Sequence, residues 1–108
     1  MRPVVLAVSS CFGVAPAFGN PTGPQVITGA VTIPGLGSQN LSTTNSLGAI
    51  IHWQGFSIGA NEVTRFTQQS AASTVLNRVV GADISHIQGQ LLSNGRIFLI
   101  NPAGIIIG

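Results

Sequence analysis

Two turns and two short apolar runs follow one another without a gap in residues 94–108, and this spacing restricts the fold more than any other feature of the chain. Asn94-Gly95 is a turn dipeptide, because both residues tolerate a positive φ angle. Residues 97–100 are all apolar, and a run of this length suits a strand that is buried on both faces. Residues 101–104 predict a second turn, in which proline fixes φ and glycine can take a left-handed conformation. Residues 105–107 then begin a strand without a partner, so we expect the chain to be the front piece of a longer protein.

The same pattern of short strands and tight turns continues through residues 20–108. Single glycines separate runs that are rich in β-branched residues, and no stretch of about ten residues or more has the apolar periodicity of an amphipathic helix. Residues 41–45 are polar and are predicted to form a connection. The predicted strands are residues 26–27, 30–33, 49–53, 56–58, 63–66, 74–80, 84–87, 91–92, 97–100 and 105–107.

A stacked solenoid accounts for these strands better than a sandwich or a barrel does. The strands are shorter than the roughly 9–11 residues of a membrane-barrel strand. The runs 97–100 and 105–107 do not alternate, as expected where neighbouring coils bury most faces. Uncharged Asn, Ser, Thr and Gln side chains at turns can stack from coil to coil without like-charge repulsion. We therefore predict an all-β solenoid whose interior is filled by four aromatic side chains, Trp53, Phe56, Phe66 and Phe98.

Residues 1–19 have the features of an export signal. Arg2 supplies a minimal positive region, an apolar segment follows, and small residues occupy the positions that precede a signal peptidase cut. We predict cleavage between Gly19 and Asn20. An apolar first strand and a lipoprotein signal ending at Cys11 are the alternatives, but the apolar stretch before Cys11 is short for a lipoprotein. The segment is also shorter than the roughly 20 residues that a transmembrane anchor needs.

Charged residues are scarce, with four arginines, two carboxylates and a net charge of +2. The arginines are scattered, so we expect no nucleic-acid partner. Glu62 and Asp83 are the two carboxylates, and polysaccharide cleavage would need both in one cleft. Together with His52 and His86 they follow no metal-ligand spacing. The sequence therefore predicts a non-enzymatic protein with no metal site and no cofactor, and a secreted β-helix enzyme acting on polysaccharide stays an alternative.

Five segments follow one another in a specific order. Residues 50–59 read Ile-Ile-His-Trp-Gln-Gly-Phe-Ser-Ile-Gly, residues 63–68 read Val-Thr-Arg-Phe-Thr-Gln, and residues 76–79 read Leu-Asn-Arg-Val. Residues 87–91 read Ile-Gln-Gly-Gln-Leu, and residues 94–102 read Asn-Gly-Arg-Ile-Phe-Leu-Ile-Asn-Pro. This succession resembles the N-terminal secretion domain of two-partner secretion exoproteins, which are large proteins of the filamentous haemagglutinin and high-molecular-weight adhesin type.

The resemblance implies a right-handed parallel β-helix that opens with an N-terminal cap and, in this chain, is truncated after the first coils. Residues 1–19 would be the signal peptide, and residues 20–108 would be a partial two-partner secretion (haemagglutination activity) domain. The resemblance also implies recognition by an outer-membrane partner transporter with periplasmic receptor domains. The secretion-motif candidates that it indicates are Asn101, Pro102, Ala103, Gly104, Asn77 and Arg78.

Each of these candidates also has a purely structural interpretation. The transporter could read the turn 101–104, or the turn could simply fix strand register, and the residue types alone favour the second interpretation. Ala103 departs from the family, which has asparagine at this place, and asparagine tolerates a positive φ angle more easily than alanine does. Arg78 with Asn77 fits a surface arginine beside an asparagine turn better than a partner contact.

We therefore expect the chain to be the secretion module of a large exported adhesin-like or haemagglutinin-like exoprotein. Such a protein would cross the periplasm of a Gram-negative bacterium and would be secreted or displayed on the cell surface. A host-cell or carbohydrate target would be bound through a downstream region. A degenerate gene fragment is the remaining alternative.

Overall fold

The computed structural model describes residues 19–108, which form ten strands and no helix within that range. The predicted export signal, apart from Gly19, lies outside the described residues. The strands are β1 (Gln25–Thr28), β2 (Val31–Thr32), β3 (Asn40–Asn45), β4 (Ala49–Trp53), β5 (Val63–Thr67), β6 (Thr74–Val79), β7 (Ser85–Ile87), β8 (Gln90–Ser93), β9 (Arg96–Ile100) and β10 (Ile105–Ile107).

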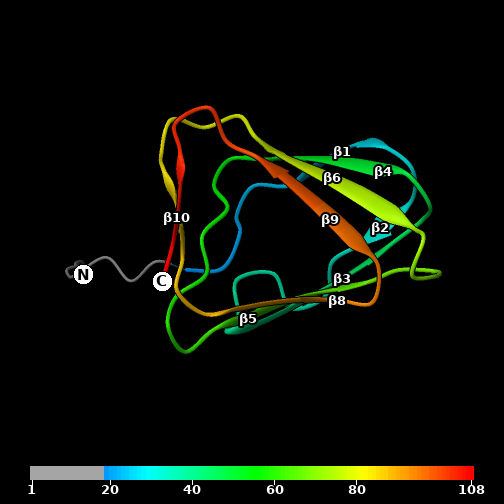
Figure 1. The fold of residues 1–108 in the computed structure, drawn as a ribbon, viewed down its shortest axis with the longest axis horizontal. Coiled ribbons are helices and arrows are strands. Elements are labelled where there is room, and N and C mark those ends of the chain that lie inside the picture. The colour runs from blue at the N-terminus through cyan, green and yellow to red at the C-terminus, as the bar shows by residue number, and fades with distance from the viewer. Residues whose placement is uncertain (1–18) are drawn as a thin grey trace, which may run out of the picture.

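From β3 onward the chain winds into successive coils with three sides, which Figure 1 shows as a rough triangle. One side stacks β4, β6 and β9, and another stacks β3, β5 and β8. The third side consists of Ile58, β7 and β10. Each strand pairs in parallel with its equivalent in the next coil, so that Val63 of β5 pairs with Gln90 of β8. The predicted parallel β-helix is therefore confirmed.

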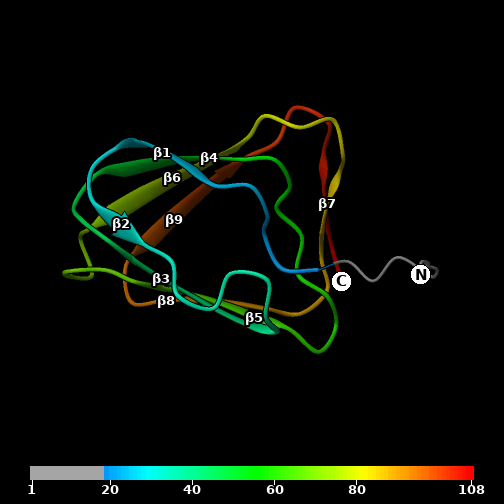
Figure 2. The same cartoon turned by 180° about the vertical axis from the view of Figure 1, so that it is seen from behind.

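The segment before β3 closes the first coil by antiparallel pairing. β1 pairs with β4, β2 pairs with β3, and Thr22 forms an antiparallel bridge with Gly55 on the third side. Figure 2 shows β1 and β2 from behind, lying across that end of the stack. The pairing covers strand edges that would otherwise present open backbone groups. This segment is the N-terminal cap that was expected of such a fold.

Asn20 closes the interior at the capped end. Its side chain is only 6% exposed. Its Nδ2 atom donates hydrogen bonds to the carbonyl oxygens of Ser38, at 2.8 Å, and of Val63, at 3.3 Å. Its Oδ1 atom accepts a hydrogen bond of 2.9 Å from the Thr64 hydroxyl. Since Pro21 is fully buried beside it, the first described residues are anchored to the second coil.

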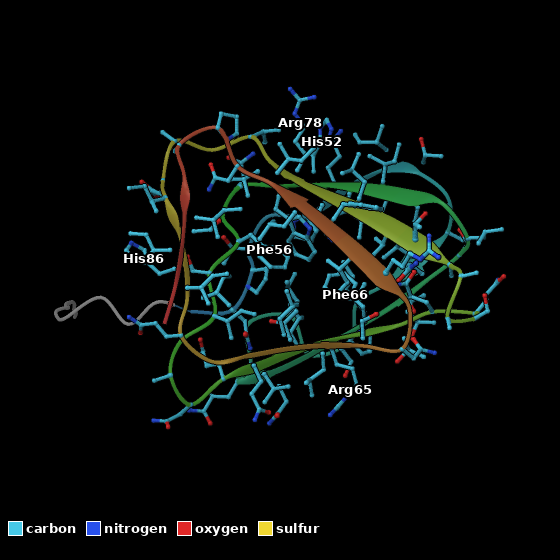
Figure 3. The ribbon with its side chains drawn as sticks, in the orientation of Figure 1. His52, Phe56, Arg65, Phe66, Arg78 and His86 are labelled. Atoms are coloured by element: carbon cyan, nitrogen blue, oxygen red, sulfur yellow. The ribbon has the colours of Figure 1, made fainter. Side chains whose placement is uncertain are left out.

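Alternate side chains of the stacked strands fill the interior, and the aromatic residues form its centre. Trp53 meets Phe56 edge to face, with ring centroids 5.6 Å apart, and Phe56 stacks on Phe66 at 6.4 Å. All three side chains are buried, and Figure 3 shows Phe56 and Phe66 pointing inward. Burying each large apolar side chain contributes about 1.5–3 kcal/mol to stability. The prediction that these three aromatics fill the interior is confirmed.

The prediction that Phe98 lies in the interior is wrong. Phe98 faces outward from β9 and is 53% exposed, whereas its neighbours Ile97 and Leu99 pack against the core. The expectation that residues 97–100 are buried on both faces is also wrong, because β9 alternates between half-buried and exposed positions. Residues 105–107 were expected to be mostly buried, but β10 is exposed throughout. A uniformly apolar run carries no alternation, so the sequence could not indicate which face is inside.

Two predicted elements also differ from the structure. Residues 41–45 form most of β3 instead of a connection, and Leu41, Thr43 and Asn45 are its buried positions. Two of these interior residues are polar, so the strand does not show the apolar alternation by which strands are recognised. Residues 56–58 form no strand, and only Ile58 makes an isolated parallel bridge, with Ile87.

Polar side chains stack from coil to coil at one corner, as the scarcity of charge led us to expect. Asn45 donates to the Gln68 side chain at 3.4 Å, and the Gln68 Nε2 atom in turn donates to the Ser93 hydroxyl at 3.0 Å and to the Arg96 carbonyl at 2.9 Å. Because each of these groups is uncharged, the stack pairs the buried Gln68 amide without like-charge repulsion, whereas the buried Asn45 Oδ1 atom has no hydrogen-bond partner among the described residues.

Candidate functional site

The turn at residues 101–104 is closed by its own backbone and by the Asn101 side chain. The Gly104 N–H donates to the Asn101 carbonyl at 3.0 Å, and the Ala103 N–H donates to the Asn101 Oδ1 atom at 2.9 Å. Gly104 has a φ of +123°, which alanine or asparagine would adopt only with strain. The left-handed position expected in this turn is thus occupied by glycine.

Asn101 also ties the turn to the preceding coil. Its Nδ2 atom donates to the carbonyl oxygen of Asp83 and to the hydroxyl of Ser85, each at 2.9 Å. The Ser85 N–H returns a hydrogen bond of 3.0 Å to the Gly104 carbonyl. The single Asn101 carboxamide therefore uses its oxygen within the turn and its nitrogen across coils, which fixes the register between β7 and β10. Ser85 could not be recognised as a partner from the sequence, because it lies 16 residues before Asn101.

Pro102 and Ala103 form the exposed tip of the turn, and their side chains are available to solvent. Among the described residues, their one hydrogen bond with a side chain is the bond that the Ala103 N–H donates to the Asn101 Oδ1 atom. The four residues of the motif candidate thus separate into an anchoring pair, Asn101 and Gly104, and an exposed pair, Pro102 and Ala103.

Asn77 is not in a turn but in the middle of β6, where its side chain is fully buried. Its Oδ1 atom accepts a hydrogen bond of 2.9 Å from the indole Nε1–H of Trp53, and its Nδ2 atom donates to the Phe98 carbonyl at 3.4 Å. Asn77 therefore links β4, β6 and β9 across the three coils. A partner could touch this side chain only while the coils are unfolded.

Arg78 lies on the outer surface of β6 and is exposed. It pairs in register with His52 of β4 and with Ile100 of β9, the residue that precedes the turn. Figure 3 shows Arg78 and His52 projecting outward on the same side of the molecule. The structure therefore places Arg78 beside the strand that leads into the 101–104 turn and separates it from Asn77, which faces the opposite way.

An open groove of about 560 Å³ lies between the cap and the loop that precedes β7. Asp83 and His86 line it, together with Gly19, Asn20, Thr22, Gly55, Ser57, Ala82 and Ile84. Glu62 does not line this groove, and its Oε1 atom accepts a hydrogen bond of 2.8 Å from the Gly59 N–H. The two carboxylates therefore do not share the cleft that an acid–base pair for glycoside cleavage needs.

Residues 19–108 offer no cluster of three or more His, Cys, Asp or Glu side chains that could hold a metal ion. In the same range, no helix has the length and apolar character needed to cross a membrane.

Comparison with known proteins shows which protein family has a similar sequence. The family model for the TPS secretion domain matches residues 24–108. A heme/hemopexin-binding protein of Haemophilus influenzae strain Rd is 37% identical over 87 residues, which is 81% of this chain and 10% of that protein. A second heme/hemopexin-binding protein of Haemophilus influenzae is 35% identical over 107 residues, which is 95% of this chain and 11% of that protein. The chain thus spans about a tenth of the length of these relatives.

A solved structure is similar as well. The crystal structure of the HMW1 secretion domain from Haemophilus influenzae superposes with a TM-score of 0.79 at 43% sequence identity. The superposition covers 82% of this chain and 24% of that domain.

Proposed function

Since this chain belongs to the TPS secretion domain family, we propose that residues 20–108 are part of the module by which a large, adhesin-like exoprotein is recognised for export. Domains of this family are recognised by a partner transporter in two-partner secretion, which carries exoproteins across the outer membrane. The observation that carries the proposal is the family match over residues 24–108, which includes every strand from β1 to β10.

Removal of a leader between Gly19 and Asn20 is the first step that we propose. Asn20 would then be the first residue of the mature chain, and its side chain is the one that closes the capped end of the coils. In the folded chain Asn20 and Pro21 are buried and Thr22 is bonded to Gly55, so a signal peptidase has no access to the bond between Gly19 and Asn20. Leader removal therefore precedes the folding of the first coil.

The next step is capture of the unfolded chain by periplasmic receptor domains of the transporter. The chain has six charged residues for 108 in total, so ion pairs offer little to hold it. Strand addition uses backbone hydrogen bonds and alternate side chains instead, and it suits a sequence made of short β segments. Coils that fold outside the cell would then oppose movement back through the transporter.

The residues of the 101–104 turn act, in this proposal, through folding and not through direct reading by the transporter. Asn101 and Gly104 hold the turn on the preceding coil, whereas Pro102 and Ala103 project into solvent. Arg78 is the candidate for a direct contact, because it is exposed beside the strand that enters the turn.

Secretion of the full-length protein from cells that carry the transporter tests this division of roles. We expect Asn101→Ala and Gly104→Ala to reduce the secreted fraction, because each weakens the anchored turn. Pro102→Ala and Ala103→Ser are matched controls at the exposed tip and should leave secretion unchanged. Loss of secretion in the tip variants, with Asn101→Ala secreted normally, would show instead that the transporter reads the tip.

Any adhesive or ligand-binding activity of the longer protein is proposed to lie outside this chain. The relatives that are described as heme/hemopexin-binding proteins match it over only about a tenth of their length. The groove beside Asp83 offers one carboxylate and one imidazole, which by themselves specify no ligand.

A further inference from the structure

Asn94 and Gly95 form the only Asn-Gly dipeptide of the sequence, and they connect β8 to β9. Glycine has no Cβ to shield its backbone nitrogen, so this nitrogen can attack the carboxamide of a preceding asparagine more easily than that of any other residue can. We propose that Asn94 is a site of spontaneous deamidation. The corner between β8 and β9, where Asn94 contacts Gln68, suppresses the reaction in the folded chain, whereas chains that stay unfolded undergo it.

The folded chain holds the Asn94 carboxamide with two hydrogen bonds to one residue of the preceding coil. The Gln68 N–H donates to the Asn94 Oδ1 atom at 2.6 Å, and the Asn94 Nδ2 atom donates to the Gln68 carbonyl at 2.8 Å. For the Cγ atom of Asn94 to meet the backbone nitrogen of Gly95, the side chain must rotate away and lose both bonds. Because Gln68 is itself 5% exposed, its backbone groups would then lose their partner in a mostly buried place.

The attacking nitrogen is engaged as well. The Gly95 N–H donates to the Ser93 hydroxyl at 3.0 Å, and this hydroxyl also accepts the hydrogen bond from the Gln68 side chain. The nitrogen must lose its proton before it can attack, and the hydrogen bond to Ser93 has to break for that proton to leave. The corner therefore restrains both the nucleophile and the electrophile of the reaction.

The fold requires the same two residue types that make the dipeptide labile. The φ angle of Gly95 is outside the left-handed region, so glycine is not needed here for the conformation that the turn dipeptide suggested. It is needed for space, because a Cβ atom at this position would lie 2.7 Å from the Gln68 Cδ atom. Position 94 needs a carboxamide, because the Gln68 backbone presents one donor and one acceptor.

The reaction consumes water and releases ammonia, and it needs no oxidant or reductant. The Gly95 nitrogen gives up its proton to solvent and forms a bond to the Asn94 Cγ atom, and the Cγ–Nδ2 bond breaks to release ammonia. Water then opens the cyclic imide. Breaking the new bond to Cγ leaves aspartate, and breaking the original peptide bond leaves isoaspartate, in which the backbone runs through the former side chain.

Either product damages the corner once the chain folds. An aspartate at position 94 can still accept from the Gln68 N–H, but it brings a carboxylate oxygen against the Gln68 carbonyl, where the amide had donated. Isoaspartate adds a backbone atom between β8 and β9, and so disturbs the register of β8 with β5 or of β9 with β6. If the proposed export route holds, a chain that waits unfolded for the transporter loses its ability to fold correctly with time.

Peptide mapping after timed incubation at mildly alkaline pH tests the proposal. The chain is kept dilute, either folded or in denaturant, and is then cut with trypsin. The peptide between Arg78 and Arg96, residues 79–96, contains Asn94 as its only asparagine. Fragment masses of this peptide separate the exchange of an amide for an acid at Asn94 from the same exchange at Gln88 or Gln90. We expect the unfolded chain to react at least about tenfold faster than the folded chain, because reaction in the folded chain requires local opening.

Two variants and one control variant sharpen the test. Ser93→Ala frees the Gly95 N–H, and the folded rate should rise about fivefold, the factor that corresponds to one ordinary hydrogen bond. Asn94→Asp should lower the denaturant midpoint, whereas Asn61→Asp makes the same change of charge at another exposed asparagine and should leave the midpoint nearly unchanged. Equal rates in the folded and unfolded chain, with a native circular dichroism spectrum retained, would overturn the proposal. So would an unfolded chain that does not deamidate at Asn94.

Discussion

Single polar residues inside the coils decide how the strands are aligned. Asn77 faces the interior, accepts from the Trp53 indole and reaches the Phe98 carbonyl, so one side chain connects three stacked strands. An apolar residue of similar size would fill the same space but would leave the indole N–H without an acceptor. A buried donor without a partner costs about 1–3 kcal/mol, which is a large part of the stability of a small domain.

We predict that Asn77→Leu lowers the free energy of unfolding by about 1–3 kcal/mol, because the Trp53 indole loses its acceptor. Denaturant unfolding followed by fluorescence measures this directly, since Trp53 is the only tryptophan. Arg78→Gln, at the exposed neighbouring position, is the control and should change stability by less than about 0.5 kcal/mol. If Asn77→Leu were as stable as the unsubstituted chain, the hydrogen bond to Trp53 would make no net contribution to the free energy of unfolding.

The sequence could identify the three aromatic residues of the interior but not its polar residues. Trp53, Phe56 and Phe66 were assigned correctly because large aromatic side chains are usually buried where a core exists. Asn77 was interpreted as part of a turn, because asparagine favours turns and its partner Trp53 lies 24 residues earlier. Nothing local to residue 77 indicates that its side chain has a buried donor to satisfy.

At the scale of elements, the N-terminal cap and the coils differ in how far they could be predicted. The strands around residues 49–53, 63–67, 74–79 and 105–107 agree with the prediction to within a residue or two, because β-branched runs bounded by turn residues are a strong local signal. β3 was missed because Thr43 and Asn45 occupy interior positions. The order in which strands stack depends on contacts between coils, and no strict sequence repeat was present to reveal it.

The burial of Asn20 in the cap leads to a prediction about processing. Purified signal peptidase should cut the unfolded chain between Gly19 and Asn20 and should cut the folded chain much more slowly, because residues 20–22 are anchored to the coils. Mass spectrometry of the products gives both the position and the rate. Asn20→Ala removes the anchoring carboxamide and should make the folded chain easier to cut. Rapid cleavage of the unsubstituted folded chain would contradict the proposed order of steps.

For the molecule as a whole, exposed apolar side chains gather on the last coil of the described chain. Phe98 is 53% exposed, Ile106 is 50% exposed and Ile107 is 80% exposed. β9 and β10 also pair on one side only within residues 19–108. An open strand edge with apolar side chains is a template for association with another chain.

We therefore predict that residues 20–108 alone self-associate in solution as their concentration rises. Sedimentation measured over a concentration series tests this. Phe98→Ser with Ile107→Ser should reduce association, because these changes remove exposed apolar surface and touch no core residue. Thr44→Ser is a matched control at an exposed site on β3. A single monomeric species at all concentrations would contradict the prediction.

Export of the full-length protein is the most direct test of the proposed function. The measurement is the fraction of that protein in the medium, for the intact protein and for a form that lacks residues 24–108, in cells with and without the partner transporter. We predict that the intact protein reaches the medium only when the transporter is present, and that the shortened form stays in the cell in both cases. Secretion of the shortened form at the normal level, or secretion of the intact protein without the transporter, would contradict the assignment of these residues to recognition.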